Sequence, residues 1–125
     1  MLEVKPIENN EAIVYCKNKN IRFNDGVTTV ISAVEKGETL GSLIYDIIDN
    51  KMVIRFIEPI DDFILADGIL RSALFIAANK SIMDVFWENP VPYDLISKLG
   101  FVKNKEECSI DVTNLFSSCE NCKKS

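Results

Sequence analysis

Apolar residues gather in three consecutive segments in the middle of the chain, and short polar stretches separate them. The segments are rich in β-branched residues, which favours strands. Asp49 and Asn50 fit a tight two-residue turn, so the pattern predicts an antiparallel meander that ends at Pro59. The predicted strands cover Thr28–Glu35, Thr39–Ile48 and Lys51–Glu58.

A helical pattern follows Asp67, where apolar residues recur at the spacing of one helix face. Asp67 is the natural N-cap, because its carboxylate suits the positive end of a helix. Asn9 or Asn10 is expected to cap an earlier helix that ends near Asn18, and Gly100 to end a short late one. The remaining predicted elements are a strand at Met1–Lys5, a strand at Ile82–Trp87, the short helix at Pro92–Leu99 and a hairpin between Phe101 and Val112.

The composition is that of a globular domain with a substantial core. The chain has 125 residues, of which 47% are hydrophobic and 26% are charged. No repeat or linker divides it, so we expect residues 1–116 to form a single domain and residues 117–125 to form a cysteine-containing tail.

Charge and hydropathy exclude two classes of partner. A net charge of −5 argues against a nucleic-acid surface, which needs clustered basic residues. No apolar run approaches the roughly 20 residues that span a bilayer, so no membrane partner is expected. The N-terminus lacks the apolar core of a signal peptide, and a cytoplasmic location is therefore expected. The chain has no His, which removes every mechanism that needs an imidazole.

The element order, the stretch Leu65–Leu74 and the segment from Asn89 to Phe101 together resemble the GNAT superfamily of N-acetyltransferases. The stretch LADGILRSAL, Leu65–Leu74, stands where the family has a glycine-rich turn and the start of its long helix. Asn89 follows the next strand, and a short helix then ends in Leu99-Gly100-Phe101, as in the family. Gly41 also matches. The similarity covers roughly residues 28 to 112 and implies an α/β (α+β) fold with a central mixed, mostly antiparallel sheet flanked by helices.

The resemblance also implies a cofactor and a reaction. Acetyl-CoA would donate an acetyl group directly to a small-molecule or peptide amine. Backbone N–H groups at a helix N-terminus would hold the pyrophosphate of the cofactor. The implied cofactor-binding residues are Ile57, Gly68, Ile69, Leu70, Arg71 and Asn89.

Some positions depart from the family pattern where the chemistry takes place. Leu70 replaces a second glycine of the phosphate turn, and its side chain can obstruct the pyrophosphate. Ile96 stands where many members have the Tyr that protonates the leaving thiolate, although Tyr93 lies nearly one turn earlier. Asp61 and Asp62 add negative charge. The second hypothesis is therefore a module that keeps the fold without turnover and buries the former cofactor cleft under side chains or in a homodimer.

Three charged residues on the predicted strands are candidates for the chemistry. Glu58 and Glu88 end the fourth and fifth strands of the family order, where a general base would stand, or they simply face water. Arg55, in an apolar strand, should either line a cleft and bind an anionic group or pair with an acid such as Asp84 or Asp46.

Four cysteines leave a further question open. Cys119 and Cys122 form a Cys-x-x-Cys pair that could be half of a zinc site completed by Cys108 and Cys16. The alternatives are a redox or disulfide role, or thiols with no role in a tail. Because a single pair is weak evidence for zinc, no metal is expected.

Overall fold

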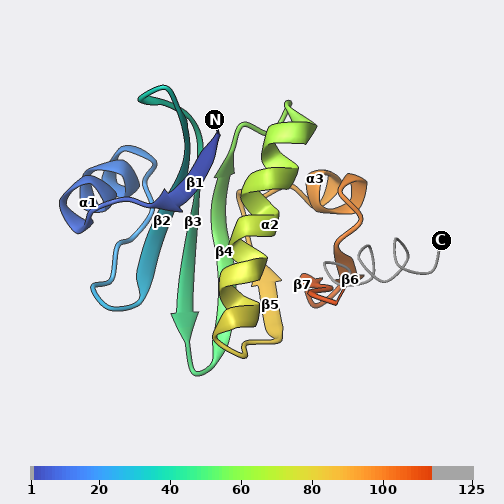
Figure 1. The fold of residues 1–125 in the computed structure, drawn as a ribbon. Coiled ribbons are helices and arrows are strands. Elements are labelled where there is room, and N and C mark those ends of the chain that lie inside the picture. The colour runs from blue at the N-terminus through green and yellow to red at the C-terminus, as the bar shows by residue number, and fades with distance from the viewer. Residues whose placement is uncertain (1, 114–125) are drawn as a thin grey trace.

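The structure is a computed structural model, and it describes residues 2–113. One mixed sheet runs through this part of the chain, with helices against both of its faces (Figure 1). In chain order the elements are β1 (Glu3–Pro6), α1 (Asn9–Asn18), β2 (Thr28–Glu35), β3 (Glu38–Ile48), β4 (Lys51–Glu58), α2 (Phe63–Asn79), β5 (Asp84–Trp87), α3 (Tyr93–Lys98), β6 (Val102–Asn104) and β7 (Ser109–Ile110).

The strands are ordered β1-β2-β3-β4-β5-β7-β6 across the sheet. Neighbours pair antiparallel except β4 and β5, which are parallel because α2 connects them. The predicted meander is confirmed, with β3 starting one residue earlier than expected. Asp49 and Asn50 have φ angles of 52° and 62°, which is the geometry of a tight hairpin turn. The expected fold class is therefore confirmed.

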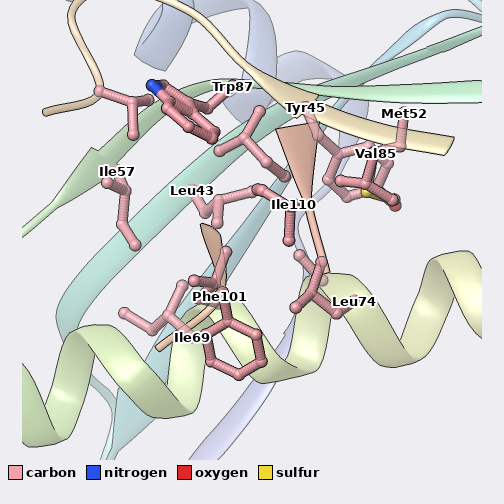
Figure 2. Packing of buried hydrophobic residues seen from close by; sticks show 14 of the residues in the cluster. Leu43, Tyr45, Met52, Ile57, Ile69, Leu74, Val85, Trp87, Phe101 and Ile110 are labelled. Atoms are coloured by element: carbon pink, nitrogen blue, oxygen red, sulfur yellow. The ribbon is translucent and has the colours of Figure 1, made fainter. Parts of the chain in front are cut away.

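Successive side chains of a strand point to opposite faces of the sheet, so the core is divided between the two faces. Ile31 and Leu43 point to one face and pack with α2 and α3, whereas Val30 and Ile44 point to the other and pack under α1. Figure 2 shows part of the larger cluster, in which Leu43, Ile69, Leu74 and Phe101 fill the space beside α2. These two faces are called the α2 face and the α1 face below.

The predicted start of α2 is wrong. The helix begins at Phe63, four residues before Asp67, because Asp62 and not Asp67 is the N-cap. The Asp62 carboxylate accepts a hydrogen bond from the Leu65 N–H at 3.1 Å, and its carbonyl accepts one from the Ala66 N–H at 2.9 Å. The apolar run after Asp62 therefore forms the first helical turn.

Smaller differences occur at other element ends. Glu8, not Asn9 or Asn10, precedes α1 as its N-cap, and its side chain makes no capping hydrogen bond. The strand expected from Ile82 is shorter, since β5 begins at Asp84. The final hairpin is confirmed as β6 and β7. Within residues 2–113, no helix has the length and apolar character needed to cross a membrane.

Candidate functional site

The two parallel strands pair over only part of their length. Their register ends with Ile54 opposite Trp87, and the Glu88 N–H then donates to the Ile54 carbonyl at 3.1 Å. β4 continues to Glu58 along β3 alone, within the part of the chain that the structure describes. The sheet therefore opens beside the last four residues of β4, and this stretch, residues 55–58, is called the β4 opening below.

A β-bulge marks the start of the β4 opening. Tyr45 of β3 pairs with Ile54 and Ile44 pairs with Phe56, so Arg55 is the extra residue. At the far end of the opening β3 approaches closely, because a Cβ built on Gly41 would lie 2.5 Å from the Glu58 carbonyl oxygen. The glycine is therefore needed for this close approach of the two strands.

Glu58 is the centre of a polar cluster on the α1 face. The Tyr15 hydroxyl of α1 donates a hydrogen bond to Glu58 Oε2. Lys19 Nζ lies 3.2 Å from the same oxygen, and the Lys19 and Glu58 side chains are 32% and 38% exposed. The hydroxyls of Ser32 and Ser42 lie 2.7 Å apart on the neighbouring strands. The cluster thus combines a carboxylate, a phenol and an ammonium that solvent can reach.

Tyr15 remains protonated in this setting. Burial raises the pKa of the Tyr15 phenol, and the hydrogen bond to the Glu58 carboxylate raises this pKa further. A phenol held in its neutral form is a hydrogen-bond donor throughout the physiological pH range.

A cavity of about 630 Å³ adjoins the cluster between α1 and the sheet. Tyr15 and Ser42 belong both to its wall and to the surroundings of Glu58. Its size is within the range of small-molecule sites. The lining residues are Ile7, Asn10, Glu11, Val14, Tyr15, Asn18, Ser32, Thr39 and Ser42.

Arg55 pairs with two acids instead of extending into solvent. Its Nη1 lies 2.8 Å from Asp46 Oδ2, and its Nε contacts Glu88. Asp46 also accepts a hydrogen bond from the Thr28 hydroxyl at 2.7 Å. The expected pairing with Asp46 is confirmed, whereas the second partner is Glu88 and not Asp84. Both candidate bases are thus ion-paired, Glu88 with the Arg55 guanidinium and Glu58 with the Lys19 ammonium, and Glu58 also accepts a hydrogen bond from Tyr15 of the cavity wall.

The helix residues expected to hold a pyrophosphate lie away from the free end of α2. Gly68 to Arg71 stand in its second and third turns, where backbone N–H groups bond to carbonyls of the preceding turn. Ile69 and Leu70 are fully buried in the core. Arg71 forms the i,i+4 ion pair with Asp67 at 2.8 Å and lies over the Phe101 ring.

The actual N-terminus of α2 borders an open cavity of about 780 Å³. Asp61 and Asp62 line it, and the Asp62 carboxylate already accepts the hydrogen bond of the Leu65 N–H. A phosphate at this helix end would meet carboxylates as well as backbone donors. The other lining residues are Leu40, Pro59, Phe63, Ile64 and Leu65.

The remaining predicted positions lie on the α2 face or in the loop after β5. Ile57 lies in the β4 opening, with its side chain buried on the α2 face. Asn89 is exposed in the loop after β5. Ile96 is fully buried, so it offers no proton, and the Tyr93 ring packs against Trp87 at 6.2 Å between centroids. Tyr93 therefore belongs to the packing around α3.

The described cysteines form no metal site. Cys16 lies on the buried side of α1 and Cys108 packs against the core of the α2 face, so the two thiols belong to different clusters. No group of three metal-ligating residues occurs within residues 2–113. Cys119 and Cys122 lie outside the described residues, as does the tail expected at residues 117–125.

Sequence reasoning missed Tyr15 and Lys19. They are four residues apart at the end of α1, and that spacing places two side chains on one helix face. The signal was available in the neighbouring Ala12 and Cys16, which form the buried stripe of α1. What the spacing could not give was the strand that this face meets.

Comparisons with known proteins identify the fold. No protein-family model matches the chain, and no curated protein sequence resembles it significantly. Among solved structures, it is similar to the ribosomal-protein-S18-alanine N-acetyltransferase of Escherichia coli, with a TM-score of 0.62 and 9% identity over 87% of this chain and 88% of that one.

Two further structures agree. A probable acetyltransferase of Staphylococcus epidermidis gives a TM-score of 0.62 at 12% identity over 81% of this chain and 83% of that one. An N-acetyltransferase, PaiA, of Thermoplasma acidophilum in complex with coenzyme A gives 0.53 at 18% identity over 79% of this chain and 64% of that one. The protein therefore has the fold of the GNAT N-acetyltransferases.

Proposed function

We propose that the protein is an N-acetyltransferase that uses acetyl-CoA to acetylate an amine by direct transfer. The observation that carries this proposal is the position of the Glu58 cluster at the end of the β4 opening. A carboxylate, a neutral phenol and a ligand-sized cavity meet there, on a fold shared with acetyltransferases.

The β4 opening would receive the acyl-bearing part of the cofactor. Its backbone edge, which includes Ile57, has no second strand within the described residues and could bond to the amide groups of the pantetheine arm. The pyrophosphate would lie near the first turn of α2, at Phe63 to Leu65, instead of the expected Gly68 to Arg71.

Glu58 would act as the general base. It would take a proton from an amine held beside it, and the amine would then attack the thioester carbonyl carbon. Tyr15 would orient the Glu58 carboxylate through its hydrogen bond. The acceptor's remaining atoms would occupy the cavity between α1 and the sheet.

The test is acetyl transfer from acetyl-CoA to a panel of primary amines, followed as release of free thiol. Glu58→Gln should lower kcat/KM by about 100-fold or more, the usual contribution of a positioned base. Glu106→Gln, which changes an exposed glutamate in the turn between β6 and β7, is the matched control and should leave the rate unchanged. Equal rates for both variants would exclude Glu58 as the base.

A second function is favoured by the acidic end of α2. Because Asp62 caps the helix and Asp61 lies beside it, the fold could serve as a binding module without turnover. Absence of acetyl-CoA binding would support this alternative. If acetyl-CoA binds but no amine causes thiol release, the protein either does not catalyse the transfer or needs an acceptor outside the panel.

A further inference from the structure

Lys19 is held as an ammonium ligand would be held. Its Nζ lies 5.5 Å from the centroid of the Tyr15 ring and 5.5 Å from that of the Phe56 ring. The Glu58 carboxylate approaches it to 3.2 Å. Two aromatic rings and one carboxylate are the groups that recognise an organic ammonium. These three side chains are called the Lys19 cage below.

The Lys19 cage stands at the β4 opening. Phe56 and Glu58 are both in that stretch and both face α1. Under the proposed function, the thioester would lie beside the same residues. The Lys19 ammonium would then stand where the proposed reaction needs its acceptor amine.

Other lysines over aromatic rings lack this combination. Lys98 lies over the Phe63 ring and Lys105 over the Tyr93 ring. Neither forms an ion pair with a carboxylate within residues 2–113. Lys19 thus contacts both a candidate base and two aromatic rings, and its side chain is still 32% exposed.

We propose that the chain acetylates its own Lys19, with acetyl-CoA as the donor and Glu58 as the proton acceptor. This inference rests on the proposed acetyltransferase function. Glu58 takes one proton from the ammonium, and Nζ attacks the thioester carbonyl carbon. The carbon–nitrogen bond forms and the carbon–sulfur bond breaks. A second proton leaves Nζ for the thiolate sulfur, which gives a neutral amide and free coenzyme A thiol.

Acetylation would change the site. The amide has no positive charge, so the ion pair with Glu58 and the cation–π contacts disappear. The Glu58 carboxylate would then be available to an amine from solution. Lys19 acetylation is therefore expected to open the cage.

The experiment incubates the full chain with isotopically labelled acetyl-CoA and maps the labelled lysines by mass spectrometry. Wild type should carry label at Lys19 in preference to Lys105, with a rate constant that does not change on dilution of the protein. Glu58→Gln should slow labelling of Lys19 by about 100-fold. Lys19→Arg should abolish the label at position 19 and leave the melting temperature unchanged. Lys105→Arg is the matched control. Urea-unfolded protein gives the uncatalysed background.

Two results would overturn the inference: labelling of Lys19 no faster than that of Lys105, or equal labelling in Glu58→Gln. The assay also separates this failure from failure of the proposed function. Thiol release with added amines but no label at Lys19 would reject self-acetylation alone. No thermal shift with acetyl-CoA and no transfer to any amine would reject both.

Discussion

Arg55 and Asp46 are charged residues that the sheet holds together on its α1 face. Arg55 is the extra residue in the β4 bulge, and its guanidinium meets Asp46 on the neighbouring strand. The Asp46 and Arg55 side chains are only 8% and 21% exposed, so each depends on its partner for charge compensation.

Removing the Asp46 carboxylate should therefore cost stability. Asp46→Ala leaves Arg55 with Glu88 alone and also removes the acceptor of the Thr28 hydroxyl, so we expect a loss of about 3 kcal/mol in the free energy of unfolding. Urea titration measures this loss. Asp84→Ala, at an exposed position on β5, should change stability by less than about 0.5 kcal/mol. Similar losses in the two variants would contradict the pairing.

The role of Gly68 depends on the residue at which α2 begins. A phosphate turn would need this glycine for a close backbone approach. The structure instead places it inside the helix, where an added Cβ would meet nothing within 4 Å.

Gly68→Ala should therefore stabilise the protein by about 0.5–1 kcal/mol, because alanine has the higher helix propensity. The midpoint of urea unfolding measures this gain. Gly41→Ala is the contrasting variant and should destabilise, since its Cβ would collide with the Glu58 carbonyl. A loss of stability in Gly68→Ala would show that this part of the helix is not as described.

The helices and strands could be predicted from the sequence better than their ends and contacts could. The meander follows from its apolar segments and from Asp49-Asn50, since strand propensity and turn chemistry act locally. The start of α2 cannot be predicted in this way, because Asp62 and Asp67 are both suitable N-caps and only the packing of the chain selects between them. The Tyr15–Glu58 contact joins residues 43 positions apart, which no local pattern encodes.

The protein as a unit combines the fold of the GNAT N-acetyltransferases with an acidic start of α2 and a polar cluster at the β4 opening. The start of α2 presents Asp61 and Asp62, whereas the β4 opening presents Glu58 with Tyr15 and Lys19. The proposed function therefore requires that the opening holds the cofactor despite the acidic helix end.

A thermal melt with increasing acetyl-CoA tests this requirement, with ATP as a polyphosphate control. We predict a saturable rise in Tm, which at a hundredfold excess over Kd corresponds to about 2.7 kcal/mol and several degrees, and a smaller effect of ATP. An unchanged Tm at millimolar acetyl-CoA would contradict the proposed function.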